Sequence, residues 1–100
     1  MSTQKKLKEM LHYNPETGVF ARKISRGNTK AGPIAGSKDK KGYIRVLFNG
    51  RRERLNRLAF LYMNGEFPKG QADHENGIKD DNRWENLRDL TNEENASNRV

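Results

Sequence analysis

The sequence predicts a small α+β fold: a short N-terminal helix, an arginine-rich β-hairpin with a helix packed on it, and a C-terminal strand–loop–strand–helix unit. Three observations lead to this prediction. Asn49-Gly50 stands between two strand-like runs, which is the strongest short signal for a hairpin. The run RLAFLYMN at 57–64 is typical of a helix and is followed by Gly65. Strand-like runs at 71–74 and 87–90 flank a polar stretch.

The chain is expected to begin with a helix over residues 2–12. Ser2 can cap this helix, and Leu7, Met10 and Leu11 form an apolar stripe along one side of it.

Residues 14–18 (NPETG) form a predicted turn, and residues 19–23 (VFARK) form a predicted short strand. Residues 25–41 are rich in glycine, lysine and serine, which indicates a loop. Because no separate core is expected on either side of this loop, it is not a domain linker. Residues 1–100 are therefore expected to form a single domain.

The hairpin should have one apolar face and one basic face. A two-residue turn at Asn49-Gly50 gives one face with these pairs: Phe48 with Arg51, Val46 with Glu53, and Ile44 with Leu55. The opposite face carries Tyr43, Arg45, Leu47, Arg52, Arg54 and Asn56. The helix at 57–64 should pack on the apolar face through Leu58, Leu61 and Tyr62. After the last strand, the capping-box spacing of TNEE at 91–94 predicts a final helix.

Composition narrows the class of partner and the type of metal. The net charge of +7 favours polyanions, with nucleic acid ahead of an anionic membrane surface. No apolar run is long enough to span a membrane, and the N-terminus lacks a signal-peptide core, so a cytoplasmic location is expected. The absence of cysteine excludes disulfides and thiolate zinc sites. Any metal would have oxygen and imidazole ligands, which favours Mg²⁺ or Mn²⁺.

The polar stretch contains the candidate site. Asp73-His74 alone is a dipeptide that most often lies in a surface turn. However, Asn86 follows in Asn-Leu-Arg, and Asn95 lies in the predicted final helix. This order resembles the HNH endonuclease family, in the asparagine-rich form found in phage and intron homing endonucleases. The resemblance covers residues 11–99 and includes Tyr13 to Phe20, Gly42-Tyr43, Asn56-Arg57-Leu58-Ala59, the Gly65 to Pro68 turn and Asp81-Asn82-Arg83.

The resemblance implies a metal-dependent DNA endonuclease that hydrolyses phosphodiester bonds and leaves 5′-phosphate and 3′-hydroxyl ends. It implies a ββα-metal module over 67–100, with 1–66 as the DNA-contacting part. Within that module, Asp73 and Asn95 would hold one divalent ion, Mg²⁺ or Mn²⁺. His74 would take a proton from the attacking water, and Asn86 would orient the loop. If the protein is phage-encoded, the resemblance places it in the cytoplasm of the host cell.

Two features complicate this assignment. On a regular strand, Asp73 and His74 face opposite ways, so the chain must bend for both to act at one phosphate. Gly77 nearby permits a sharp loop. The family commonly has His-Arg-Leu where this chain has Asn56-Arg57-Leu58. The alternative is therefore a DNA-binding protein with a catalytically degenerate HNH fold, and RNA binding also fits the charge.

The basic residues are candidates for contact with double-stranded DNA. Tyr43, Arg45, Arg52 and Arg54 would place a ribbon in the major groove, or they form a solvated face. Lys38, Lys40 and Lys41 can add contacts to phosphates. Arg83 and Arg88 either grip the scissile strand or pair with Asp80, Asp81 or Asp89. Trp84 is expected to anchor the loop in the core. One site per chain predicts nicking by a monomer, while a double-strand cut needs a weak homodimer or two events.

Overall fold

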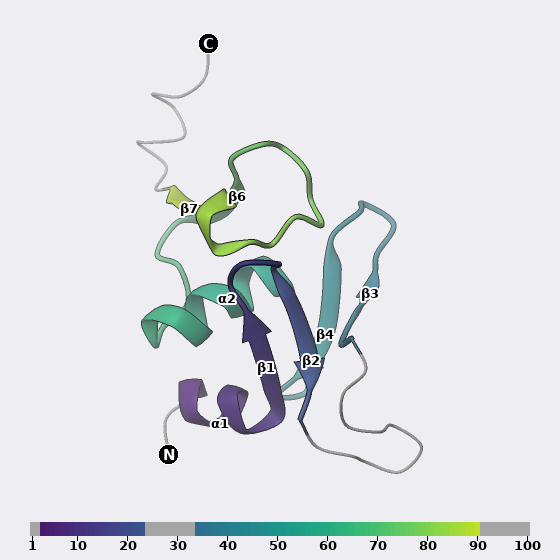
Figure 1. The fold of residues 1–100 in the computed structure, drawn as a ribbon, viewed down its shortest axis with the longest axis vertical. Helices are drawn as coiled ribbons and strands as arrows, with labels where there is room; N and C mark the ends of the chain where they lie inside the picture. Colours follow the sequence, from purple (N-terminus) through teal and green to yellow (C-terminus); the bar gives the residue numbers. More distant parts are fainter. Residues whose placement is uncertain (1–2, 24–33, 91–100) are drawn as a thin grey trace.

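The computed structural model describes residues 3–23 and 34–90 (Figure 1). Its elements are α1 (Thr3–Met10), β1 (Leu11–Asn14), β2 (Val19–Arg22), β3 (Ser37–Lys38), β4 (Ile44–Phe48), β5 (Arg51–Arg54), α2 (Leu55–Asn64), β6 (Gln71–His74) and β7 (Leu87–Leu90). A short 3₁₀ turn, Trp84–Asn86, precedes β7. The strands form small antiparallel sheets, β1–β2, β3–β4–β5 and β6–β7, so the predicted α+β class is confirmed.

The N-terminal helix is shorter than the sequence predicted. It ends at Met10, and Leu11 already pairs with Arg22 as the first residue of β1. Burial alternates along β1, where Leu11 and Tyr13 are buried and His12 is exposed. The expected helix over 2–12 was wrong at its end, because pairing with β2 stabilises an extended backbone there. Ser2, the predicted cap, lies outside the described residues.

The turn over 14–18 is confirmed. The Gly18 N–H donates to the carbonyl of Asn14 at 2.7 Å, and Gly18 has a φ of 77°. The Asn14 side chain accepts a bond from the Glu16 N–H at 2.9 Å, which is the local bonding expected of an asparagine in a turn.

Part of the predicted loop over 25–41 is a strand. Ser37–Lys38 forms β3, which pairs with β4 through Ser37↔Arg45 and Lys38↔Ile44. Asp39 closes the connection to β4, because its carboxylate accepts bonds from the backbone N–H groups of Lys41 and Tyr43. Two residues carry too little pattern to identify a strand from sequence.

The hairpin has the predicted turn and register. Phe48 pairs with Arg51 and Val46 pairs with Glu53. Asn49 and Gly50 have φ values of 53° and 78°, the left-handed conformation that a two-residue hairpin turn requires. The expected pair between Ile44 and Leu55 does not form. The ladder ends one position earlier, because Leu55 begins helix α2.

Helix α2 starts two residues before the predicted 57–64 and ends as expected. Gly65 has a φ of 85°, and its N–H donates to the Leu61 carbonyl at 3.0 Å. Neither α1 nor α2, the helices of the described part, has the length and apolar content needed to cross a membrane. The buried side chains of α2 join a core with α1, β1, β2, β4 and the start of β7: Leu7, Leu11, Tyr13, Phe20, Ala35, Val46, Phe48, Leu55, Leu58, Ala59, Phe60, Leu61 and Leu87.

The predicted strands at 71–74 and 87–90 are confirmed as β6 and β7, paired from Gln71↔Leu90 to His74↔Leu87. Figure 1 shows the loop between them lying over the turn that joins β1 and β2. The Trp84 N–H donates to the Pro15 carbonyl at 2.9 Å, and its indole packs edge-on against Phe60 at 5.0 Å. Trp84 therefore anchors the loop on the core, as expected. The predicted final helix lies outside the described residues.

Candidate active site

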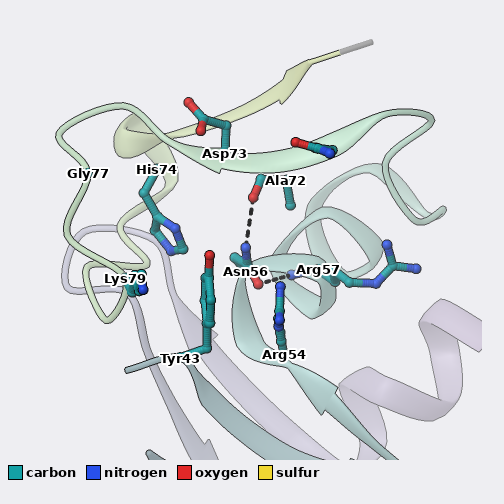
Figure 2. Close-up of a pocket in the computed structure, with 10 residues that line it drawn as sticks. Tyr43, Arg54, Asn56, Arg57, Ala72, Asp73, His74, Gly77 and Lys79 are labelled. Carbon is teal, nitrogen blue, oxygen red and sulfur yellow. Dashed lines mark hydrogen bonds between the residues drawn. The ribbon is translucent and has the colours of Figure 1, made fainter. Parts of the chain in front are cut away.

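A cavity of about 390 Å³ lies where β6 and its following loop face the hairpin and the start of α2. Figure 2 shows its lining, made of Tyr43, Arg54, Asn56, Arg57, Gln71, Ala72, Asp73, His74, Gly77 and Lys79. Both residues of the Asp73-His74 pair therefore line one cavity. Among the lining side chains, three are cationic and one is a carboxylate, so the cavity favours an anionic ligand.

Asp73 and His74 leave β6 in opposite directions (Figure 2). The strand stays regular up to the His74↔Leu87 pair. The chain turns only after it, where the Gly77 N–H donates to the His74 carbonyl at 2.9 Å. The imidazole is buried, with 7% exposed, whereas the Asp73 side chain is 36% exposed. The bend expected between the two residues is therefore absent from β6. The imidazole points toward Tyr43, whereas the Asp73 carboxylate points to the opposite side of the strand (Figure 2).

The His74 ring has one bonded nitrogen. Its Nε2 lies 2.9 Å from Oδ1 of Asn82, a buried side chain in the same loop. Within residues 3–23 and 34–90, no group forms a hydrogen bond with Nδ1. The ring of Tyr43 lies 6.0 Å away, between centroids. Asn82 was not among the site residues predicted from the sequence, where its place in Asp81-Asn82-Arg83 was the signal available.

Asn86 connects two points of the loop that follows His74. Its Oδ1 accepts a bond from the Asn76 N–H at 3.0 Å, and its Nδ2 donates to Oδ1 of Asn76 at 3.0 Å. The same Nδ2 donates to the Asp81 carbonyl at 2.8 Å. The Asn86 carbonyl also accepts the Glu75 N–H at 2.8 Å. Because the side chain is buried, with 5% exposed, these bonds are shielded from competing water.

Arg83 is paired within the loop. Its guanidinium lies 2.8 Å from the Asp81 carboxylate and 2.9 Å from that of Glu85. Hydrogen bonds from Arg83 hold the pKa of the Asp81 carboxyl well below its usual range, against the desolvation that opposes them, and Asn76 adds a further bond. Of the two alternatives for Arg83, the structure shows pairing with an aspartate.

The Asp81 ion pair predicts an acid dependence of stability. The pKa of Asp81 in the folded protein lies below the unfolded value of about 3.9. The ionised carboxylate therefore stabilises the fold fully above that pH, and this stabilisation is lost as the pH falls toward the folded-state pKa. Below about pH 4, the melting temperature of the wild type should therefore fall more steeply than that of Asp81→Asn. Thermal melts followed by circular dichroism measure this. Glu85→Gln, at a more exposed partner of Arg83, should follow the wild type, and parallel curves for wild type and Asp81→Asn would contradict the prediction.

Asp73 is paired with Arg88 across the β6–β7 sheet. The Arg88 guanidinium donates to Oδ2 of Asp73 at 2.7 Å, whereas Oδ1 has no hydrogen bond within the described residues. The aspartates predicted as partners of Arg88 were Asp80, Asp81 and Asp89, so this pair was not predicted from the sequence. Asn95, the other expected metal ligand, lies outside the described residues. In the part of the chain that the structure describes, no three His, Cys, Asp or Glu residues group together as metal ligands would.

The predicted basic face of the hairpin divides into two regions. The Arg54 guanidinium lies 3.9 Å from the centre of the Tyr43 ring and lines the His74 cavity. Arg45 and Arg52 line a separate hollow together with Lys38, Asp39, Lys40 and Lys41. Arg45 is bound to the Asp39 carboxylate at 2.7 Å, and Arg52 donates to Ser37 at 3.2 Å. Arg54 is therefore the arginine of the hairpin strands that lines the candidate site.

Asp39 remains ionised within the second hollow. Desolvation alone would raise the pKa of Asp39. The hydrogen bonds from the Arg45 side chain and from the backbone N–H groups of Tyr43 and Lys41 lower it by more, so the pKa lies below its usual value. The adjacent Lys38 pairs with Asp80 at 3.0 Å and so joins this region to the loop that follows His74.

Asn56, where the family commonly has histidine, is buried at the start of α2. Its Nδ2 donates to the Ala72 carbonyl at 2.8 Å, and its Oδ1 accepts the Arg57 N–H at 3.1 Å (Figure 2). Asn56 therefore holds β6 to α2 at the residue before Asp73. An asparagine at this position in place of the histidine therefore still supports the candidate site.

The comparisons with known proteins agree with this geometry. Residues 53–97 match the family model described as HNH endonuclease. A solved structure described as "DNA binding and cleavage by the HNH homing endonuclease I-HmuI" matches with a TM-score of 0.62 and 26% identity, covering 89% of this chain and 51% of that chain. The chain thus spans about half the length of that protein. A search of curated proteins found no match. Residues 53–97 are therefore similar to the HNH endonuclease family, and the fold of the chain is similar to that of an HNH homing endonuclease.

Proposed function

We propose that this protein is a divalent-metal-dependent DNA endonuclease of the HNH type that nicks one strand of duplex DNA. The observation that carries the proposal is the placement of a buried histidine, with one ring nitrogen unbonded in the described chain, in a cavity lined by cations. A histidine with a free nitrogen can act as a general base. Arginine and lysine beside it suit the negative charge of a phosphodiester.

In this proposal His74 takes the proton of the water that attacks phosphorus. Arg54 and Lys79, on either side of Tyr43, bind the non-bridging phosphate oxygens; the Lys79 ammonium lies 5.2 Å from the centre of that ring. These contacts hold the phosphate against the imidazole and stabilise the extra negative charge of the transition state. Asn86 keeps the loop after His74 closed through its three side-chain hydrogen bonds.

Asp73 offers one oxygen ligand of the kind that a hard divalent ion takes. Asp73 presents a partly exposed carboxylate whose Oδ1 is unbonded within the described residues. Oxygen ligands of this type suit Mg²⁺ or Mn²⁺, and we propose Asp73 and Asn95 as the pair that would hold the ion. When bound, such an ion neutralises charge on the phosphate and on the leaving oxygen. Arg88 would neutralise Asp73 whenever the ion is absent.

The remaining basic residues are proposed to position the duplex. Arg45, Arg52 and the lysines of the second hollow do not line the His74 cavity. Contacts from them to phosphates would set the register of the DNA on the protein. I-HmuI is described as a DNA-binding and DNA-cleaving homing endonuclease, and by this similarity we propose a homing-type role. A monomer has one site and would cut one strand at a time.

A second candidate is a DNA-binding protein whose HNH site no longer cuts. The feature behind this candidate is Asn56, which stands where the family commonly has histidine. The hydrogen bond of Asn56 to Ala72 argues for the enzyme, because it retains a side chain that supports β6 beside Asp73.

Incubation of supercoiled plasmid with the purified full chain tests the proposal. Nicked circles should form with Mg²⁺ or Mn²⁺ and should be absent when EDTA is present. Phage DNA and plasmids of different sequence should be included, because homing-type enzymes select their targets. Binding without nicking on every DNA and with both metals would favour the degenerate alternative.

Arg54→Ala should weaken DNA binding and reduce its dependence on salt. Loss of one phosphate contact lowers the slope of log K against log salt concentration by about one. Fluorescence anisotropy of a labelled duplex over a salt series measures this slope. Arg51→Ala is the matched control, since Arg51 is an exposed arginine of the same strand that does not line the cavity. Equal slopes for Arg54→Ala and the wild type would exclude Arg54 from phosphate contact.

A further inference from the structure

Asn82 is a buried polar residue in the loop between β6 and β7. The residue is 2% exposed, although positions 75–80, the first part of this loop, are all exposed. A buried carboxamide is costly unless it is hydrogen-bonded, so its position in the loop needs a structural reason. The Asn82 side chain is hydrogen-bonded to the imidazole of His74, whose Nε2 lies 2.9 Å from Oδ1 of Asn82.

The contact defines which nitrogen of His74 carries the proton in the neutral ring. A carboxamide oxygen only accepts hydrogen bonds, so the Nε2–H of His74 must be the donor to Oδ1 of Asn82. In neutral imidazole the other nitrogen then has a free lone pair. That nitrogen is Nδ1, which forms no hydrogen bond in the described part of the chain.

The N-terminal hairpin β1–β2 holds the backbone of Asn82. The Tyr13 hydroxyl donates to the Asn82 carbonyl at 2.6 Å. Burial raises the pKa of Tyr13, and the nearby Asp81 raises it further, so the hydroxyl keeps its proton as a donor. Gly18 also approaches closely, because a Cβ placed there would clash with the Asn82 carbonyl carbon. This hairpin lies outside residues 53–97, the segment that matches the HNH family.

We infer that Asn82 is a positioning residue that keeps His74 in the Nε2–H tautomer, leaving Nδ1 as the nitrogen that accepts a proton, and that Tyr13 holds Asn82 in place. The role of Nδ1 in catalysis rests on the proposed nuclease function. The tautomer itself does not, because it follows from the hydrogen bond alone. The β1–β2 hairpin is thereby part of the site, although it contributes no group that touches the phosphate.

Nitrogen-15 NMR of the metal-free full chain tests the tautomer directly. The chain has two histidines, and His12→Ala leaves His74 as the sole imidazole. At mildly alkaline pH, where free imidazole is neutral, long-range proton–nitrogen correlations distinguish the protonated from the unprotonated ring nitrogen. The wild-type ring should be protonated on Nε2. Protonation on Nδ1, which a carboxamide turned to donate its NH₂ would produce, overturns the inference.

Variants at position 82 test the cause. Asn82→Leu has a similar size but no acceptor, and the fixed Nε2–H signal should become a mixture of tautomers. Asn82→Asp keeps an acceptor oxygen and should retain Nε2–H. Tyr13→Phe keeps the buried ring and loses only the hydroxyl bond to the Asn82 carbonyl, so it should partly loosen the tautomer. If the tautomer is unchanged in Asn82→Leu, Asn82 does not position His74. If that variant does not fold, the wild-type spectrum still shows whether His74 carries its proton on Nε2.

Nicking rates separate this inference from the proposed function. With folded Asn82→Leu, kcat should fall roughly tenfold, the effect of one net hydrogen bond, while duplex affinity stays at the wild-type value. Asn82→Asp should restore most of the rate. If the wild type nicks and Asn82→Leu nicks equally fast, the positioning role fails and the nuclease function stands. If the wild type does not nick, the nuclease function fails and the NMR result still decides the tautomer.

Discussion

His74→Ala is expected to lower the rate of plasmid nicking by about 10²- to 10⁴-fold, the usual contribution of a general base. The imidazole is the group in the described cavity with an unbonded nitrogen suited to accept a proton from water. Removal of the ring leaves Arg54, Arg57 and Lys79 unchanged, so affinity for duplex DNA should stay within about twofold. Quantified gels of nicked circles against time give the rate, and anisotropy gives the affinity.

His12→Ala is the matched control for this experiment. His12 is exposed on β1 and does not line the cavity, so its replacement should leave the nicking rate unchanged. The mutation leaves Oδ1 of the buried Asn82 without its hydrogen-bond partner, which can destabilise the protein. A cooperative thermal melt must therefore first show that His74→Ala is folded. If folded His74→Ala nicks at the wild-type rate, His74 is not the base.

Asn86→Ala is expected to destabilise the protein by about 2 kcal/mol, because it removes buried hydrogen bonds and leaves their partners unpaired. The lost bonds are those to the Asn76 N–H, the Asn76 side chain and the Asp81 carbonyl. The loop that these bonds close carries Asn82, so nicking should also fall by about tenfold or more when His74 loses its orientation. Urea denaturation followed by tryptophan fluorescence measures the stability, since Trp84, the single tryptophan, lies in this loop.

Asn64→Ala provides the comparison for Asn86→Ala. Asn64 is an exposed asparagine at the end of α2, and its replacement should change stability by less than about 0.5 kcal/mol. An Asn86→Ala variant as stable as Asn64→Ala would show that the loop does not depend on these bonds. A variant that is destabilised and still nicks at full rate would separate the loop's stability from the orientation of His74.

Local signals were enough to predict much of the fold. Asn49 and Gly50 adopt the left-handed conformation that a tight hairpin turn needs, and the alternation of Val46 and Phe48 with exposed residues sets the register. Gly65 ends α2 in the same way. These features depend on neighbours a few positions apart, so the sequence contains all of the information that they require.

Other boundaries depended on partners elsewhere in the chain. Leu11 continues a helical stripe by its spacing, yet it forms the first pair of β1 with Arg22. Ser37–Lys38 has no strand pattern and becomes β3 by pairing with Arg45 and Ile44. In both cases the sheet supplies hydrogen bonds that the local pattern does not encode.

The candidate site was also predictable only in part. Asp73 and His74, which are adjacent in sequence, were identified from the sequence alone, and their catalytic roles stay predictions. The fold shows that Asn82 is hydrogen-bonded to His74 and to Tyr13. It also shows that Arg54 lines the cavity, whereas Arg45 is paired with Asp39. Patterns along a chain record which side chains are apolar and at what interval. A hydrogen bond between distant polar groups depends on distance and direction, which exist only after the core has brought the segments together.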